Sequence, residues 1–411
     1  MQKFFLVLLF VIFQTQAQWQ ELIVEPPYYI QTIQVNDGNY PTPSNILPLN
    51  HKLYVSFDDL QADEKDYYYK IVRYDENWQP TQLQISEYID GFESDIITGI
   101  EQSTGTLQSY THYFFSIPNE NTKILLSGNY IMEILDDEEQ VVFSRAFVLY
   151  EKKVDIGIQI NWPYDIAVKD KKQMLDLYLY KGNYNIYNEQ ETLQIKVLQN
   201  NNWHTIKTFT TPSSYQGNKW IYHYPSRLLF NGLNEFRAFE TKDIRGMNYG
   251  IVKRELVDNL YDFYVYPDYY RTHYLYYKDI DGAFIINSVQ AEENKNIEAD
   301  YVYVHFTFDG DLEVGERLFV SGNFNDFTPK AYHELKYNEE TGKYELSLLL
   351  KQGYYNYMYV IKKNASEDYS LTEGNFAQTE NFYQVLVYYR PPGSRFCKVI
   401  GYGKANSQKI K

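Results

Sequence analysis

The chain has 411 residues, a formal net charge of −16, 44 tyrosines and one cysteine, so it is long enough for several packed domains and cannot form an intrachain disulfide. The excess of acidic residues disfavours binding to phosphate backbones and to anionic lipid. Apolar and polar residues alternate with period 2 and no long helical pattern occurs, which predicts an all-β protein.

The first 17 residues predict an export signal. Lys3 precedes an apolar run from Phe4 to Phe13, and Thr15 to Ala17 supplies the small residues that a signal peptidase reads. The run is too short to span a bilayer. We therefore expect cleavage after Ala17, without lipid attachment because no cysteine follows, and a soluble mature protein that is exported to the periplasm.

A short pattern of a leucine pair, a glycine and an alternating strand occurs three times, around Gly128, Gly232 and Gly353. The spacing of roughly 100 residues suits β-sandwich domains. The pattern predicts three tandem sandwiches of the immunoglobulin-like or early-set type. The expected boundaries are a signal peptide at 1–17, sandwich domains at 18–152, 153–290 and 291–395, and a polar C-terminal tail at 396–411.

The second domain is expected to end in a connecting segment, Leu260 to Tyr277, that is dense in tyrosine. One sandwich cannot bury so many hydroxyl groups without a hydrogen-bond partner for each. Part of the segment should therefore lie on the surface or between domains. Tyrosine combines a large contact area with a polar hydroxyl, so we predict that Tyr266, Tyr269 and Tyr270 contact a partner protein.

The third domain carries a polar turn between two strands, starting at Gly322. The turn and the strand that begins near Gly353 resemble the early-set sandwich of starch- and glycogen-binding modules. In that resemblance Phe327 takes the place of a sugar-stacking tryptophan, which implies an alternative function as an exported carbohydrate-binding protein. The turn residues are also predicted to contact a protein partner: Asn323, Phe324, Asn325 and Phe327.

No stretch of the sequence has the spacing of a catalytic or metal-binding motif. The seven histidines are scattered, without His-Glu-x-x-His, and there is no Gly-x-Ser-x-Gly. Asp279 to Gly282 and Asp309 to Asp311 match only fragments of calcium loops. A glycosidase carboxylate pair leaves no sequence signature, but three sandwiches leave no room for a catalytic domain. We expect a non-enzymatic protein without cofactor or metal, and leave weak sugar or calcium binding open.

The C-terminal third is also similar to type IX secretion system plug proteins of Bacteroidetes. The similarity rests on Glu373 to Phe376, Thr379 to Tyr383, Val387 to Pro391 and Ile400 to Tyr402, and extends to the export signal and the tandem sandwiches. It implies structural roles for a set of signature residues: Gly322, Gly353, Glu380, Asn381, Tyr383, Tyr388, Tyr389 and Arg390.

The same resemblance implies a function. A plug protein binds the periplasmic mouth of the outer-membrane translocon barrel, of the SprA/Sov type, and closes it when no substrate is passing. The expected protein is a monomer within a larger complex that does not insert into the membrane. It is associated with the outer membrane through protein contacts alone, and binds no nucleic acid.

Overall fold

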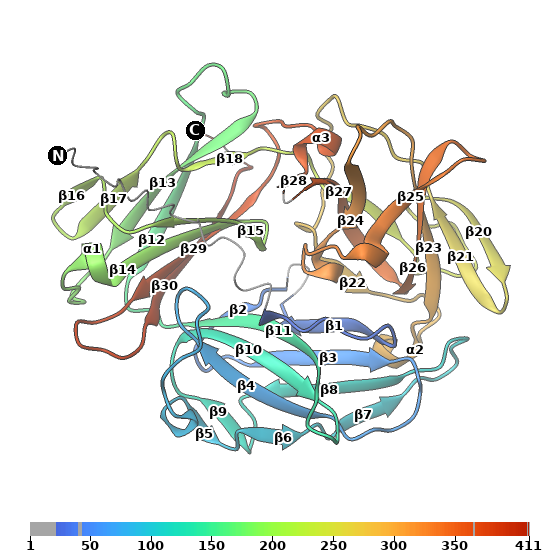
Figure 1. Cartoon of the computed structure of the whole chain (residues 1–411), viewed down its shortest axis with the longest axis horizontal. Helices are drawn as coiled ribbons and strands as arrows, with labels where there is room; N and C mark the ends of the chain where they lie inside the picture. The colour runs from blue at the N-terminus through green and yellow to red at the C-terminus, as the bar shows by residue number, and fades with distance from the viewer. Residues whose placement is uncertain (1–21, 40–42, 365, 409, 411) are drawn as a thin grey trace, which may run out of the picture.

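Strands make up almost all of the regular structure of this chain (Figure 1). The computed structural model describes residues 22–39, 43–364, 366–408 and 410. The predicted signal peptide at 1–17 lies outside these residues. The prediction of an all-β fold made of sandwiches is confirmed, and the sheets group into three lobes around a common centre.

The first lobe is a sandwich of two sheets whose inner faces share one core, which includes Phe57, Tyr113, Tyr130 and Phe147. Aromatic rings fill it, as in the stacked pair Phe57 and Tyr113 with centroids 5.1 Å apart. Its elements are, in sheet order, β1 (Ile30–Asn36), β3 (Leu53–Asp59), β8 (Thr111–Ile117) and β7 (Gly99–Gln102); β2 (Ile46–Pro48), β11 (Val141–Tyr150), β10 (Gly128–Leu135), β4 (Tyr68–Tyr74) and β6 (Ser94–Ile96); and the pair β5 (Ile89–Gly91) and β9 (Thr122–Ile124), with the 3₁₀ turn η2 (Ile85–Glu87).

The second lobe combines strands from the middle of the chain with its last two strands. One sheet is β12 (Asp155–Asn161), β13 (Lys172–Tyr180), β17 (Lys219–His223) and β16 (Ser214–Gln216), with β18 (Leu229–Asn231) beside β13. The other is β15 (Asn202–Phe209), β14 (Leu193–Gln199), β29 (Phe382–Tyr389) and β30 (Lys398–Asn406), and the short helix α1 (Glu189–Thr192) precedes β14. The two sheets bury a core that includes Leu177, Ile195, Trp220 and Val385.

The third lobe is inserted between the two halves of the second. Its long sheet runs β19 (Arg237–Glu240), β27 (Gly353–Lys363), β24 (Glu316–Ser321), β25 (Glu334–Asn338), β26 (Lys343–Lys351), β23 (Tyr301–Phe308), β21 (Leu260–Val265) and β20 (Ile251–Val257). Smaller elements complete it: β22 (Phe284–Ile286) and β28 (Ser366–Asp368) beside β27, the helices α2 (Lys295–Glu298) and α3 (Ser370–Glu373), and the 3₁₀ turns η3 (Asn323–Asn325) and η4 (Ala331–His333). The sheet curls around a core that includes Phe239, Phe306, Val320 and Tyr357.

This connectivity corrects the contiguous boundaries 153–290 and 291–395 and the polar tail 396–411. The segment expected to be a tail contains β30, which pairs antiparallel with β29. Its glycines serve close packing: a Cβ at Gly401 would lie 2.7 Å from the side chain of Val154, and one at Gly403 would lie 2.6 Å from that of Ile156. Only glycine allows β12 to approach β30 this closely.

Buried polar contacts join the first lobe to the third. Asp58, fully buried at the end of β3, accepts a hydrogen bond of 2.6 Å from Lys351 Nζ, another of 2.6 Å from the Tyr301 hydroxyl, and lies 2.6 Å from His112 Nδ1. Burial alone would favour the neutral acid, but the Lys351 ammonium and His112 hold the pKa of Asp58 below its usual value. The ion pair between Asp58 and Lys351 therefore stabilises the joint between the first and third lobes as long as both charges are present.

The joint between the first and second lobes uses the end of β29. The Tyr388 hydroxyl donates to Asn129 Oδ1 at 2.7 Å, and both side chains are buried. Arg390 Nη2 lies 2.7 Å from Glu76 and 3.3 Å from Asp75, which follow β4. Two of the predicted signature residues thus lie at a contact between segments more than half the chain apart.

Candidate functional site

The tyrosine-rich segment lies at one edge of the third lobe, as β21 and the loop that follows it. Tyr266 and Tyr269 expose 56% and 55% of their surface. Tyr270 is half-buried: its ring packs edge-on against Phe308 and its hydroxyl donates to the Asp311 carbonyl at 2.6 Å. Two of the three predicted tyrosines are therefore available to a partner, whereas Tyr270 mainly fixes the loop.

Further apolar side chains are exposed beside these tyrosines, on β20. Among the described residues this strand forms the outer edge of the long sheet, and the backbone N–H of Tyr266 donates to the Gly250 carbonyl at 3.1 Å, which places Tyr266 opposite the residue that precedes β20. We call the exposed set the β20–β21 surface: Tyr249, Val252, Leu256, Val257, Tyr266 and Tyr269, each 41 to 58% exposed. Exposed apolar side chains on an unpaired strand edge are typical of protein contact sites.

The sequence prediction missed the β20 part of this surface. Val252, Leu256 and Val257 have the residue types of a core strand, and nothing local indicates that β20 lies at an edge. In the structure Ile251 is buried whereas Val252 is exposed, and Val252 lies at an irregularity in the register between β20 and β21.

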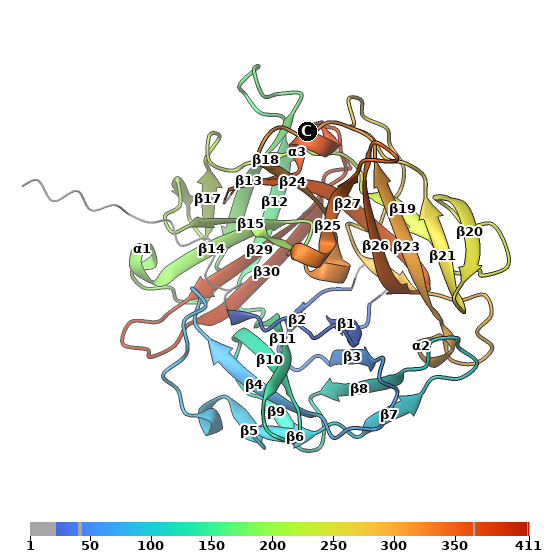
Figure 2. The same ribbon diagram turned by 45° about the vertical axis from the view of Figure 1, so that its right-hand side comes forward.

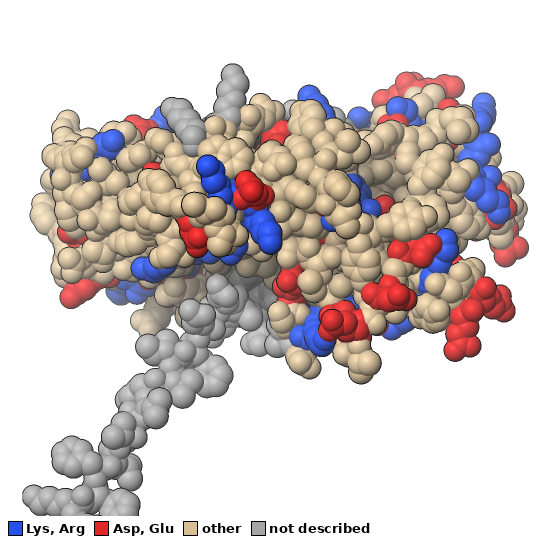
Figure 3. Space-filling model, turned by 90° about the horizontal axis from the view of Figure 1, so that it is seen from above, with Lys and Arg blue, Asp and Glu red and all other residues tan. Residues whose placement is uncertain are grey.

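Charge on the molecule is mixed in sign. On the face shown in Figure 3, most of the surface is uncharged, and acidic and basic side chains are interspersed. On β20 itself, Lys253 and Glu255 form an ion pair of 2.7 Å. A partner at this surface would therefore be recognised mainly by apolar and aromatic contact rather than by a single-sign field.

The predicted turn at Gly322 forms η3 and lies in the centre of the molecule, away from the β20–β21 surface. Asn325 holds the turn: its side chain accepts from the Gly322 N–H at 3.0 Å and donates to the Val320 carbonyl at 3.0 Å. Phe324 is half-buried, and Phe327 is only 3% exposed, against Phe236. A buried ring can neither stack on a sugar nor contact a partner, which corrects the prediction for Phe327.

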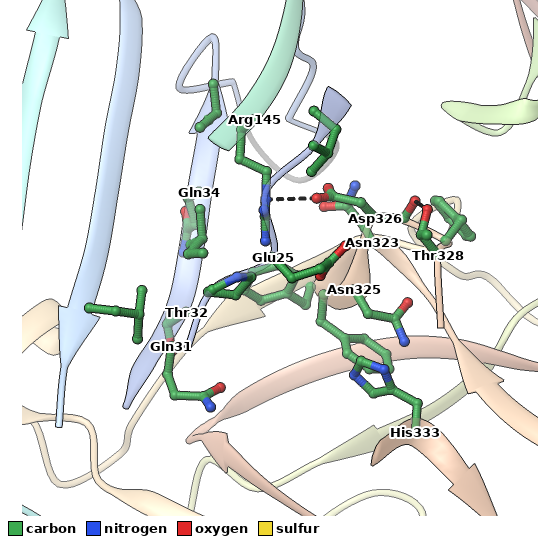
Figure 4. A pocket seen from close by; sticks show the side chains of 18 of the residues that line it. Glu25, Gln31, Thr32, Gln34, Arg145, Asn323, Asn325, Asp326, Thr328 and His333 are labelled. Carbon is green, nitrogen blue, oxygen red and sulfur yellow. Dashed lines mark hydrogen bonds and ion pairs between the residues drawn. The ribbon is translucent and has the colours of Figure 1, made fainter. Parts of the chain in front are cut away.

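A cavity of about 470 Å³ lies where the three lobes meet, and Asn323, Phe324 and Asn325 form part of its wall (Figure 4). Two ion pairs cross from lobe to lobe at its rim: Arg145 Nε to Asp326 at 2.7 Å, and Lys330 to Glu25 at 2.9 Å. His333 also lines it, and burial lowers the pKa of this imidazole to about 4, so the ring is neutral at neutral pH.

The remaining signature residues are mostly buried and hold strands together. Tyr383 donates to Gln173 Oε1 at 2.7 Å, Asn381 Nδ2 donates to the Gly232 carbonyl at 2.9 Å, and the Tyr389 hydroxyl accepts from the Tyr187 N–H at 3.2 Å. Gly322 and Gly353 leave no room for a Cβ, which would lie 2.7 and 2.4 Å from backbone carbonyl oxygens. Such contacts fit the structural roles that the sequence comparison implied for these residues.

Four carboxyl groups gather where the chain crosses between the second and third lobes: Glu235, Asp279, Asp281 and Glu380. Burial, reinforced by the neighbouring Asp279 and Glu380, raises the pKa of Glu235 from 4.5 to about 7. Burial and Asp279 likewise raise the pKa of Asp281 to about 7. Glu235 accepts hydrogen bonds from the Tyr274 hydroxyl at 2.7 Å and from the Glu380 N–H at 3.1 Å. These donors fix the carboxyl without neutralising it.

We expect Glu235→Gln to stabilise the protein above pH 7. A carboxyl whose pKa is raised on folding favours the folded state while it is protonated, so its contribution is lost as the pH rises from about 4.5 to 7. Glutamine keeps the acceptor oxygen without the charge. The gain should be on the order of 1–2 kcal/mol at pH 8 and near zero at pH 5. Melting temperatures across this range test it, with the exposed Glu340→Gln as control; an equal shift at both pH values would contradict it.

In the part of the chain that the structure describes, no three His, Cys, Asp or Glu side chains are arranged to hold a metal ion. No helix among the same residues is long and apolar enough to cross a membrane. Neither the carboxyl cluster nor the calcium-loop fragments at Asp279 and Asp309 therefore provide a ligand set for a cation in this arrangement.

Comparison with known proteins finds a relation over the first lobe. Residues 30–151 match the family model described as the first domain of the type 9 secretion system plug protein. This match supports a relation of the first lobe to the type IX secretion plug family. No curated protein matches the chain.

A solved structure resembles the whole chain. The crystal structure of a hypothetical protein from Parabacteroides merdae has a TM-score of 0.89 and 28% sequence identity, and the match covers 93% of this chain and 98% of that one. The three-lobed arrangement therefore recurs in a second protein over nearly its full length. The BSP domain of a biofilm-associated protein, at 8% identity over 93% of this chain and 60% of its own, has a TM-score of only 0.18, too low for any argument.

Proposed function

We propose that this protein is a periplasmic plug that binds the periplasmic opening of the type IX outer-membrane translocon barrel, of the SprA/Sov type, and seals it when no substrate is passing. The observation that carries the proposal is the match of residues 30–151 to the first domain of the plug protein family. The predicted export signal and the similarity of the C-terminal segments to the same family support it independently.

The architecture suits a seal. A barrel wide enough for folded cargo leaks unless a broad, rigid body closes it. Three lobes joined by buried contacts such as Asp58 to Lys351 and Tyr388 to Asn129 form such a body. Flexible attachment of the lobes would leave gaps, whereas buried joints keep the outer surface in one shape.

The β20–β21 surface is our candidate for the contact with the barrel. It offers six exposed apolar or aromatic side chains and a free strand edge in one region of the third lobe. Tyrosine is enriched among the few central residues that contribute most of the binding energy of an interface, and a strand edge can add backbone hydrogen bonds. The Gly322 turn is not part of this contact, because it lies at the central cavity.

Deletion of the gene tests the proposal. The outer membrane of the deletion strain should become permeable to large hydrophilic antibiotics, while secretion through the barrel continues, because a plug blocks a path and does not power it. Antibiotic susceptibility and secreted cargo are measured in the same cultures. An intact permeability barrier, with the translocon present and no other subunit bound to its opening, would reject the plug function.

Complementation with variants tests the surface. Tyr266→Ala combined with Tyr269→Ala should restore the barrier only in part and reduce recovery of the barrel in a pull-down from solubilised outer membranes. Tyr164→Ala, which removes a 68% exposed tyrosine from the second lobe, should restore it fully. If both variants seal equally well, the contact lies elsewhere while the plug function itself stands.

A further inference from the structure

The central cavity has an open strand edge along one wall. Within the residues that the structure describes, β1 is the outer strand of its sheet and pairs with β3 alone, and all seven of its residues line the cavity. In an antiparallel pair, alternate residues direct their N–H and C=O groups away from the partner strand. Among the described residues, the backbone of Gln31 to Asn36 makes no hydrogen bond beyond the β1–β3 ladder. β1 therefore presents free backbone donors and acceptors to the cavity.

The opposite wall also contains a strand edge that is partly unpaired among the described residues, that of β26. β23 covers one edge of β26 along its whole length, but β25 pairs with the other edge only at Lys343 to Glu345. The next residues, Ser347 to Leu350, line the cavity. The hydroxyl of Thr32 on β1 lies 2.5 Å from that of Tyr301 on β23, the strand paired with β26, so the two walls touch at this point. The cavity is thus a slot with β1 on one side and β26 on the other. Figure 2 shows β1 on the side of the first lobe that faces the third lobe, which contains β26.

The side chains of the slot define what it would accept. Its charged groups are already matched, Arg145 with Asp326 and Lys330 with Glu25. Gln31, Gln34 and Thr32 reach into it from β1 (Figure 4), and Leu348 and Phe324 add apolar area opposite. An uncharged ligand with amide groups and alternating apolar side chains fits these walls, whereas a charged one would have to compete with an existing ion pair.

We propose that this slot binds an extended, uncharged polypeptide segment of a partner protein, which adds to β1 as a further strand. Strand addition supplies affinity through backbone hydrogen bonds and selects side chains through alternate pockets. The volume of about 470 Å³ lies in the range of ligand sites. The register of β1 with β3 is interrupted between Gln31 and Gln34, where Thr32 has a φ of 52°, so the partner segment would pair with the regular part of the edge, Gln34 to Asn36. The site is separate from the β20–β21 surface and does not depend on the plug function.

Peptide selection tests the proposal. A random dodecapeptide library displayed on phage is selected against the purified chain, and the selected peptides are synthesised and measured by fluorescence anisotropy. Gln34→Trp fills the slot and should weaken their binding at least tenfold. Gln82→Trp, at an exposed glutamine outside the slot, should leave it unchanged. In the unmodified chain, bound peptide should slow amide hydrogen exchange in residues 31–36 and 346–350, a result that needs no variant to fold.

Four outcomes would overturn the proposal. The selection could return no peptide that binds in solution, or peptides that bind Gln34→Trp as well as the unmodified chain. Exchange could slow only outside the two strands. Finally, maltoheptaose or laminarihexaose, run as a parallel arm, could protect the slot where no peptide does, which would assign it to a sugar instead.

Discussion

Replacing Asp58 by alanine is expected to lower the free energy of unfolding by about 3–5 kcal/mol. The substitution leaves the Lys351 ammonium, itself 1% exposed, without its counter-charge. Tyr301 and His112 lose an acceptor at the same time. Urea unfolding followed by tryptophan fluorescence measures the loss. An unchanged urea midpoint would show that the first and third lobes are not joined through this group.

The double variant separates lost charge pairing from lost packing. In Asp58→Leu with Lys351→Met, both charges are replaced by apolar side chains of similar size, and most of the stability should return because no buried charge is left unpaired. Asp155→Ala provides the surface control: its partner Lys152 is 3.8 Å away and both side chains are more than 70% exposed, so the effect should stay within about 0.5 kcal/mol.

The local sequence pattern predicted the fold class because the alternation of apolar and polar residues lies within each strand. β26 and β27 have alternating sequences of this kind, and the polar turn at Gly322 lies between strands as expected. Lobe boundaries depend instead on pairing between distant segments. β14 pairs with β29, nearly 190 positions later in the chain. No local pattern carries that information, so the insertion of the third lobe was not predictable.

The candidate site was also predictable only in part from the sequence. High tyrosine density indicated that some rings of the segment 260–277 must be exposed, and Tyr266 and Tyr269 are. Whether a given ring is exposed depends on neighbours elsewhere in the chain. Phe327, for example, is covered by Phe236, which precedes β19, and by Met358 on β27. The free edge of β1 likewise exists only because no later strand pairs with it, which a sequence does not state.

Valine in place of Gly232, at the crossing between the second and third lobes, or of Gly353, at the start of β27, should have the second large effect. A Cβ built on Gly232 would lie 2.0 Å from the Phe376 carbonyl oxygen, and one on Gly353 would lie 2.4 Å from that of Ile285. Backbone atoms cannot move aside as a flexible side chain can. Gly232→Val should therefore destabilise the protein by about 3 kcal/mol, and Gly353→Val by roughly 1–3 kcal/mol.

Gly232 is the more sensitive of the two because it lies where both chain crossings between the second and third lobes meet. Its carbonyl accepts from Asn381 Nδ2 at 2.9 Å, and the segment from Phe376 returns beside it. Gly157→Val is the matched control: it lies within β12, where an added Cβ has no neighbour closer than 3.8 Å, so valine should be tolerated. The melting temperatures of the three variants test this prediction. Equal values would mean that the backbone accommodates the added side chains and that Gly232 and Gly353 have no packing role.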